Sequence, residues 1–288
     1  MKWLLICPWD RPLVPHLGGN GTLATMPLLG QSLVEYWLGH LAYQGAKEVV
    51  ILADEQPDLV RQVAGDGARW GISVRVIEES RELSSAQVLL KYERELDPTS
   101  LQNQIVCLDH LPGQPEIPLF EDYANFFKAL LTFMPNARTP ERVGVREIEP
   151  GIWAGLNCHV SADAQLQAPC WLGKNVFIGS KAMIGPNTII EDGSFIDSMA
   201  AVSEGFVGAD TYIGQCSEVV GSMAIGNMLI KISTGATIQI PDIFVMCGLR
   251  RPKATPTAGW LEKLSDLCVK NKGEASLLWK HFLMNRES

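Results

Sequence analysis

The sequence lacks the features that mark a zinc-stabilised, disulfide-linked or membrane-inserted protein. Its seven cysteines are scattered over 288 residues and form no CxxC pair, which argues against zinc sites and a disulfide framework. No apolar run reaches the roughly 18 residues of a membrane span. The apolar start is broken by Pro8, too early for a signal peptide. We therefore expect a cytoplasmic protein with reduced thiols and no membrane partner.

Basic residues are also scarce relative to acidic ones. The chain has 24 Lys and Arg against 32 Asp and Glu, a net charge of −8. An acidic surface repels the phosphates of nucleic acids and of anionic lipids, so neither is expected as a partner. A length of 288 residues allows one or two domains with a sizeable core.

A period of six residues is the strongest pattern in the sequence. Aliphatic side chains recur at this spacing, with one slip of a residue after Val202. Their positions are Val160, Leu166, Leu172, Ile178, Ile184, Ile190, Ile196, Val202, Val207, Ile213, Val219 and Ile225. Four residues after each stands a second set, most of it small: Ala164, Cys170, Val176, Ala182, Thr188, Ser194, Ala200, Phe206, Thr211, Ser217, Met223 and Leu229.

This double register predicts a parallel β-helix built from hexapeptide repeats. Three short strands make one triangular coil of about eighteen residues. Inside it, the residues of both sets stack on those of the next coil at the strand spacing of about 4.8 Å. Neither an α-helix nor an alternating strand has a period of six. We predict about four coils, and the later aliphatic residues indicate a last coil or strand at Ile238, Ile240, Ile243 and Val245.

The first 146 residues alternate between strand-like and helix-like segments. Strands are predicted at residues 3–7, 49–52, 72–76 and 105–108, and helices at residues 33–45, 57–63, 84–96 and 121–134. Strands that alternate with helices form a parallel sheet covered on both faces. We therefore expect an α/β domain over residues 1–146, a β-helix over residues 147–248 and a helical tail over residues 249–288.

Three blocks of the α/β segment, at residues 26–36, 45–51 and 67–79, resemble the sugar-phosphate nucleotidylyltransferases. Members of this family join a sugar 1-phosphate to a nucleoside triphosphate and release pyrophosphate. The mannose-1-phosphate guanylyltransferase and glucose-1-phosphate thymidylyltransferase relatives carry a left-handed β-helix after a Rossmann-like domain. The resemblance therefore implies a shortened Rossmann-like domain followed by a left-handed β-helix, with a nucleoside triphosphate and a sugar 1-phosphate as ligands.

The resemblance also implies roles for five residues. Arg11 stands where the family has the arginine of its phosphate loop, and Asp109, after a predicted strand, stands where the family binds Mg²⁺. Ser84, Ser85 and Gln87 stand where the family approaches the nucleotide base. A carboxylate at the carboxyl end of a parallel strand faces the crevice in which ligands bind. Structural interpretations stay open beside these: Ser84 and Gln87 have the spacing of a capping box, and Asp109 fits a solvated loop carboxylate.

The sequence departs from the family where the chemistry is concentrated. Residues 7–13 replace the glycine-rich phosphate loop, and Met26 occupies the family's lysine position before Pro27. A glycine cluster at residues 18–21 is either a substitute phosphate loop or an ordinary turn. Only about 40 residues separate Asp109 from the β-helix, whereas the family uses a longer segment there to build its sugar-binding half. We expect that half to be missing.

Three functions remain open on these grounds. The first is a sugar-1-phosphate nucleotidylyltransferase that uses Mg²⁺. The second is a non-catalytic regulatory or scaffold subunit of that family. The third is a hexapeptide acyltransferase with His159 as general base, although an edge histidine also fits a plain surface position. We expect a homo-oligomer or a partner of an intact transferase. The tail, with a basic turn at residues 250–253 and a helical apolar pattern at residues 260–268, is expected to cap the last coil or to pack on a neighbouring subunit.

Overall fold

The computed structural model describes residues 1–249 apart from gaps at residues 19–20, 94–103 and 139–143, and residues 250–288 lie outside it. The described residues belong to one unit, Met1–Leu249. The predicted tail helix and basic turn lie outside the described residues, as does the middle of the glycine cluster. Those predictions therefore stay predictions.

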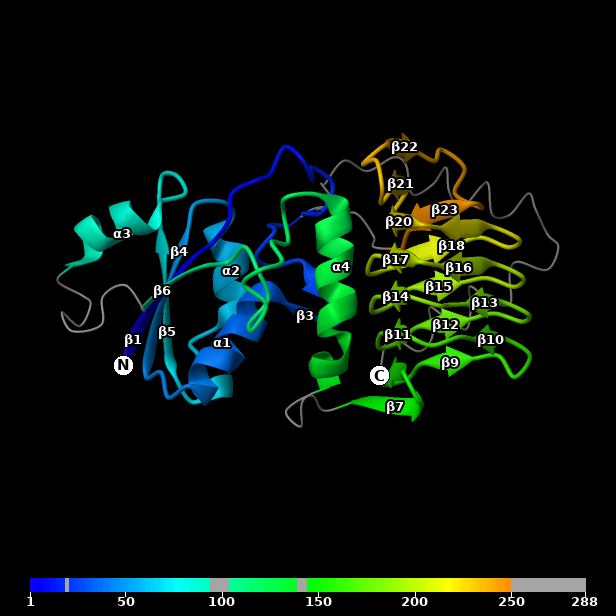
Figure 1. Cartoon of the computed structure of the whole chain (residues 1–288), viewed down its shortest axis with the longest axis horizontal. Helices are drawn as coiled ribbons and strands as arrows, with labels where there is room; N and C mark the ends of the chain where they lie inside the picture. Colours follow the sequence, from blue (N-terminus) through cyan, green and yellow to red (C-terminus); the bar gives the residue numbers. More distant parts are fainter. Residues whose placement is uncertain (19–20, 94–103, 139–143, 250–288) are drawn as a thin grey trace, which may run out of the picture. The chain divides into compact units, whose positions relative to one another are not determined.

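The first part of the chain folds around a four-stranded parallel sheet (Figure 1). The strand order is β5-β4-β1-β6, and each neighbouring pair is parallel. The strands are β1 (Lys2–Ile6), β4 (Glu48–Ala53), β5 (Ser73–Glu78) and β6 (Ile105–Cys107). The four predicted strands and their parallel arrangement are confirmed.

Helices cover both faces of this sheet, as its apolar strands require. Two helices share a buried cluster with Leu5 and Ile51 on one face, and the third shares a cluster with Leu4 on the other. In chain order they are α1 (Leu33–Tyr43), α2 (Pro57–Ala64) and α3 (Ser85–Tyr92), with a short 3-10 turn, η1 (Ala68–Trp70), after α2. Within the described part of the chain, no helix combines the length and the apolar character that a bilayer crossing requires.

A tight hairpin leads into α1. Its strands are β2 (Pro27–Leu28) and β3 (Gln31–Ser32), which pair antiparallel. The two turn residues, Leu29 and Gly30, have φ values of 51° and 76°, as a two-residue hairpin turn of type I′ demands. Ser32 then caps α1 in a capping box with Glu35, so this block of sequence fixes both a turn and a helix start.

One helix connects the α/β sheet to the second half of the chain. α4 (Tyr123–Phe133) begins at Asp122, whose carboxylate accepts a hydrogen bond from the backbone N–H of Asn125 at 2.6 Å. A 3-10 turn, η4 (Met134–Arg138), follows, and the next described strand is β7 (Val145–Glu149). Among the described residues between Asp109 and β7, α4 and η4 are the only regular elements, which leaves no room for a further lobe.

From Ile152 onward the chain winds into a parallel β-helix (Figure 1). Parallel strands stack in three series, β8-β11-β14-β17-β20, β9-β12-β15-β18 and β10-β13-β16-β19. In chain order the strands are β8 (Ile152–Gly155), β9 (His159–Val160), β10 (Gln165–Leu166), β11 (Cys170–Leu172), β12 (Phe177–Ile178), β13 (Met183–Ile184), β14 (Thr188–Ile190), β15 (Phe195–Ile196), β16 (Ala201–Ser203), β17 (Gly205–Val207), β18 (Thr211–Ile213), β19 (Glu218–Val220) and β20 (Ser222–Ile225).

Aliphatic residues one coil apart stack as predicted. Leu172 pairs with Ile190, and Ile178 pairs with Ile196. These side chains share one buried cluster inside the coils, and Cys170 of the second register is fully buried there. The predicted fold class, a shortened α/β domain followed by a β-helix, is therefore confirmed.

Three residues of the predicted inward registers do not line the interior: Phe206, Met223 and Ile225. Gly205 takes the place opposite Thr188, and Ala224 takes the place opposite Val207. The cause is a shorter turn after Val202 and a second one after Val219, each of which removes a residue from its coil. The aliphatic register of the sequence placed the first slip correctly, at Val207. The second register placed it one repeat too late, and neither register revealed the second slip.

Antiparallel strands close both ends of the β-helix. β7 pairs with β8 at the start, and β21 (Met228–Lys231), β22 (Thr237–Gln239) and β23 (Met246–Gly248) add antiparallel strands at the end. Of the two alternatives predicted here, a last coil or a strand, the strand is confirmed at Ile238, and the described residues after β20 form no further coil. With no coil to enclose them, Ile238 and Ile243 are each 60% exposed.

The outer face of the longest β-helix sheet is apolar and buried. Trp153, Trp171 and Ile189 on this face belong to the same buried cluster as Leu5 of the α/β sheet. Phe206 packs edge-to-face on Phe126 of α4, with ring centroids 5.6 Å apart. The contact with Phe126 explains why Phe206 faces outward. The shared cluster joins the α/β sheet and the β-helix through one hydrophobic core.

Candidate functional site

Charged side chains gather at the carboxyl edge of the parallel sheet. Arg11 follows β1, Asp54 follows β4, Glu82 follows β5 and Asp109 follows β6. The carboxyl edge of a parallel α/β sheet is the usual place of a ligand crevice. The charges of Asp109 and Asp54 both act on Arg11, so the topology brings together two of the predicted site residues, Arg11 and Asp109.

Arg11 is held in a two-pronged pair with Glu82. Its Nη1 donates to Glu82 Oε2 at 2.7 Å, and its Nη2 donates to Glu82 Oε1 at 2.8 Å. The backbone N–H of Trp9 donates to the same Oε2 at 2.9 Å. Both charged side chains are about 30% exposed, so the pair lies at the protein surface beside the carboxyl edge of the sheet. Three donors from the loop after β1 thus converge on one carboxylate.

The electrostatics of the edge follow from this pair. Burial alone would raise the pKa of Glu82, but hydrogen bonds from Arg11 and Trp9 outweigh burial and lower it. The hydrogen bond to Glu82 raises the pKa of Arg11. Burial raises the pKa of Asp54, and the negative charge of Glu82 adds to this effect. Carboxylates therefore outnumber the single guanidinium here, and that guanidinium is already neutralised by one of them.

Asp109 stands half exposed at the end of β6, with a side-chain exposure of 52%. Its Oδ1 lies 2.6 Å from Nδ1 of His110. The backbone carbonyl of His110 accepts a hydrogen bond from Trp37 Nε1 at 2.9 Å, and the His110 ring packs edge-to-face on Trp37. The described residues contain no group of three His, Cys, Asp or Glu side chains placed to hold a metal ion. Asp109 is therefore a single, fixed carboxylate rather than part of a preformed metal cage.

Ser84 and Gln87 form the capping box that starts α3. Ser84 Oγ accepts from the Gln87 backbone N–H at 3.4 Å, and Gln87 Oε1 accepts from the Ser84 backbone N–H at 3.0 Å. Both side chains are thus engaged in capping, in line with the structural interpretation of the spacing. Whether they also contact a nucleotide stays a prediction.

Ser85 instead turns toward the carboxyl edge. Its Oγ lies 3.5 Å from Sγ of Cys107, the last residue of β6. Burial raises the pKa of Cys107, and the charges of Asp109, Glu82 and Arg11 all act on it. Ser85 therefore belongs to the same group of side chains as Arg11 and Asp109.

Three residues of this edge were not among the sequence-predicted site residues: Glu82, Asp54 and Cys107. Asp54 could have been found, because it follows a buried strand in the same way as Asp109 does. Glu82 could not, since no spacing in the sequence shows that the loop after β5 reaches the loop after β1 across the sheet.

A buried carboxylate of the β-helix also contacts the α/β domain. Glu191 is fully buried, and its two oxygens accept hydrogen bonds from the backbone N–H groups of Leu29 and, at 2.9 Å, Gly30. These are the turn residues of the β2-β3 hairpin. The β-helix therefore fixes the turn of the sequence block that carries the family resemblance.

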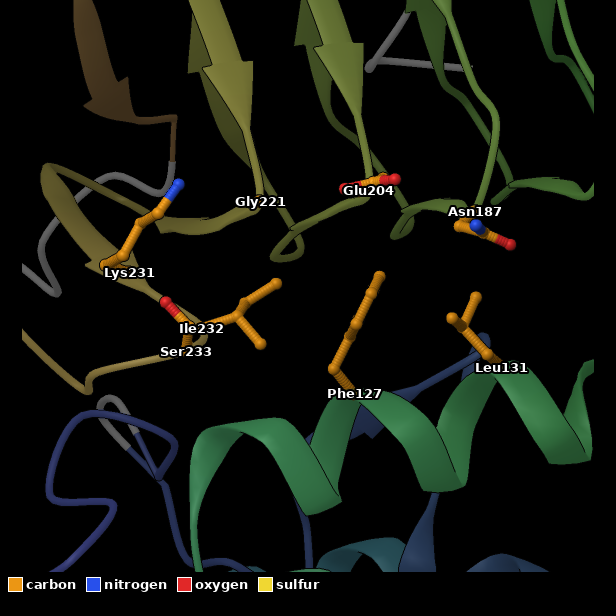
Figure 2. Close-up of a pocket in the computed structure, with 8 residues that line it drawn as sticks. All are labelled: Phe127, Leu131, Asn187, Glu204, Gly221, Lys231, Ile232 and Ser233. Atoms are coloured by element: carbon orange, nitrogen blue, oxygen red, sulfur yellow. The ribbon is translucent and has the colours of Figure 1, made fainter.

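A groove of about 350 Å³ lies between α4 and the turns of the β-helix (Figure 2). Phe127 and Leu131 point into it from α4, opposite Glu204. The remaining lining residues are Asn187, Gly221, Lys231, Ile232 and Ser233. Lys231 Nζ donates to the carbonyl of Val220 at 2.9 Å. None of the sequence-predicted site residues lines this groove.

His159, the candidate base of the acyltransferase hypothesis, lies exposed on β9. Its ring stacks on Phe177 with centroids 5.1 Å apart, and Phe177 stacks on Phe195 at 4.3 Å. The histidine thus begins an aromatic ladder on the outer face of one β-helix sheet. A role for it in acyl transfer stays a prediction.

Comparison with known proteins adds a family match and two weak structural likenesses. Residues 23–151 match the family model described as Nucleotidyl transferase. The match includes Ser84, Ser85, Gln87 and Asp109 and begins after Arg11. Two solved structures resemble the chain: variants of perosamine N-acetyltransferase and of GDP-perosamine N-acetyltransferase from Caulobacter crescentus, both in complex with CoA and GDP-perosamine. The identities are 13% and 12%, and each alignment covers 62% of this chain and 93% of that chain with a TM-score of 0.19.

Proposed function

We propose that the chain, whose residues 23–151 match the Nucleotidyl transferase family model, binds a nucleoside triphosphate at the carboxyl edge of the β5-β4-β1-β6 sheet. The reaction we assign to this edge is that of the sugar-phosphate nucleotidylyltransferases: a sugar 1-phosphate attacks the α-phosphate, and pyrophosphate leaves. The observation that carries the proposal is the gathering of Arg11, Ser85 and Asp109 at the carboxyl ends of the adjacent strands β1 and β6.

Each of these side chains suits one part of a nucleotide. The guanidinium of Arg11 presents paired N–H donors, the geometry that phosphate oxygens accept. Ser85 lies at the start of α3, beside Cys107, where the family approaches the base. The transfer brings two anionic groups together, so positioning and charge neutralisation supply most of its rate.

Mg²⁺ is the cofactor that this chemistry implies, and Asp109 is the residue that would hold it. Its carboxylate is half exposed, and oxygen is the ligand that Mg²⁺ prefers. The ion is commonly bound by one or two carboxylates together with substrate phosphates and water, so a single carboxylate fits this mode. When bound, Mg²⁺ would neutralise phosphate charge.

A non-catalytic subunit of the same family is the second candidate. It is supported by α4, whose packing on the β-helix fills the segment in which a sugar-binding half would be built. It is supported as well by the Arg11–Glu82 pair, which occupies the phosphate donors. Such a subunit would bind a nucleotide in the cytoplasm and assemble with an intact transferase or with further copies of itself.

An assay of pyrophosphate release distinguishes the transferase from the non-catalytic subunit. The full-length protein is incubated with Mg²⁺, each of the common nucleoside triphosphates and a panel of sugar 1-phosphates, and pyrophosphate is measured. Turnover that disappears in Asp109→Ala supports the transferase, with Glu48→Ala as a control for a carboxylate at the opposite, amino end of the sheet. Nucleotide binding without turnover supports the non-catalytic subunit. Neither binding nor turnover with any nucleotide would contradict both.

A further inference from the structure

We infer that Glu82 is an internal occupant of the phosphate position, so that a polyphosphate binds at Arg11 only when Glu82 leaves. This inference rests on the proposed function, because it concerns how the same edge admits its ligand. It assigns to Glu82 a regulatory contact that neither the family match nor the sequence pattern suggests.

The geometry of the pair is that of an anion site that is already filled. Two guanidinium N–H groups of Arg11 and the backbone N–H of Trp9 donate to one carboxylate at 2.7, 2.8 and 2.9 Å. A planar fork of donors with an adjacent backbone N–H binds carboxylate and phosphate oxygens in the same way. A phosphate and the Glu82 carboxylate therefore compete for the same three donors.

Glu82 also sits on a segment that is fixed at both ends and irregular between them. At one end, the carboxylate of Glu79 accepts from Lys91 Nζ at 2.8 and 2.6 Å and from the hydroxyl of Tyr92. At the other end, Ser84 caps α3. The residues between Glu79 and Ser84 belong to neither strand nor helix, so Glu82 can swing away while both anchors stay in place.

The surrounding negative charge explains why a polyphosphate binds poorly at Arg11 while Arg11 is paired with Glu82. Asp54 and Asp109 act on Arg11 and Glu82 in addition to the pair itself. With Glu82 in place, the edge carries no free positive charge among these four side chains. Removal of the Glu82 charge leaves one guanidinium available and one carboxylate fewer to repel the ligand.

The test is a calorimetric titration of the full-length protein with inorganic pyrophosphate and with each nucleoside triphosphate, all in Mg²⁺. Glu82→Gln keeps the shape of the side chain and removes its charge. We expect it to bind pyrophosphate at least about tenfold more tightly than the wild type. Glu82→Ala, which also removes the hydrogen bonds, should do the same. Glu48→Gln is the matched control, because Glu48 pairs with Lys2 at 3.1 Å at the amino end of the same sheet.

The outcomes distinguish this inference from the proposed function. If the wild type binds nucleotide and both Glu82 variants bind it equally or more weakly, the inference is overturned and the proposed function stands. If a gain in Glu82→Gln persists when Arg11→Ala is added, Arg11 is not the competed group and the inference is again overturned. If neither the wild type nor any folded Glu82 variant binds pyrophosphate or a nucleotide, the inference and the proposed function fall together.

Discussion

The carboxylate of Glu191 in the β-helix accepts a hydrogen bond of 2.9 Å from the backbone N–H of Gly30 in the α/β domain. A second N–H, that of Leu29, donates to the same buried carboxylate. The two hydrogen bonds join segments of the chain that are 161 residues apart in the case of Gly30 and Glu191. The two halves of the chain are therefore linked by a specific polar contact as well as by apolar packing.

Replacement of Glu191 is expected to destabilise the whole protein. Glu191→Ala leaves the N–H groups of Leu29 and Gly30 buried without their acceptor, at a cost of about 2–4 kcal/mol. Urea denaturation followed by circular dichroism measures the free energy of unfolding. Asp192→Asn is the control, because the side chain of this half-buried neighbour accepts a backbone hydrogen bond from Lys174 at 2.7 Å and contacts no backbone N–H of the hairpin turn among the described hydrogen bonds. Equal effects of the two substitutions would contradict a special role for Glu191.

The Phe126–Phe206 contact should be a strong energetic link between α4 and the β-helix. Each alanine substitution is expected to cost about 3–5 kcal/mol, because both rings are buried. The double variant should show a coupling of about 0.5–1.5 kcal/mol between the rings. Phe177→Ala, on the aromatic ladder of another sheet face, should cost less. Strictly additive single effects would show that the rings do not interact.

Ser84 and Ser85 are adjacent, but alanine substitution should affect stability at Ser84 and nucleotide affinity at Ser85. Ser84→Ala removes the cap of α3 and should lower stability by about 1 kcal/mol, with little change in nucleotide affinity. Ser85→Ala should leave stability nearly unchanged and weaken nucleotide binding several-fold. Asp122→Ala, which removes the cap of α4, is the stability control. A large loss of nucleotide affinity in Ser84→Ala would instead favour the direct contact suggested by the family resemblance.

The Arg11–Glu82 pair predicts a defined pH dependence of stability. Burial opposes the charged form of Glu82, but the bonds from Arg11 and Trp9 prevail and lower its pKa in the folded state. The stabilisation is therefore fully present above the pKa of an unfolded glutamate, about 4.3, and is lost as the pH falls through the lower folded value. The difference in unfolding free energy between the wild type and Glu82→Gln should shrink below about pH 4. If the difference in unfolding free energy between the wild type and Glu82→Gln stays constant from neutral to acidic pH, the Arg11–Glu82 pair is not the source of that difference.

The sequence predicted the β-helix well because one repeating spacing controls which side chains can stack. Leu172, Ile178 and Ile184 could be assigned to the interior of the coils from their six-residue spacing alone, without knowledge of contacts with distant parts of the chain. The outward position of Phe206 was not predictable in that way, since it depends on a shortened turn and on a partner, Phe126, from another element. The contrast shows that periodicity determines the interior of a coil but does not reveal where the chain drops a residue.

The candidate site was predictable only in part for a similar reason. Asp109 could be placed because it directly follows a strand, and the carboxyl ends of parallel strands share one edge. The partner of Arg11 depends on the strand order β5-β4-β1-β6, which the sequence does not specify. The Glu191–Gly30 contact likewise depends on how the β-helix meets the hairpin, so only the structure reveals it.

The central claim is that a nucleotide binds at the carboxyl edge of the α/β sheet. Hydrogen–deuterium exchange of the full-length protein, with and without a saturating Mg²⁺-nucleoside triphosphate, tests it most directly. We predict protection of the backbone in the loops around Trp9 and Arg11, from Glu79 to Ser85 and around Asp109, with the groove beside Phe127 and Leu131 unchanged. Protection confined to that groove, or none at all with any nucleotide, would contradict the account.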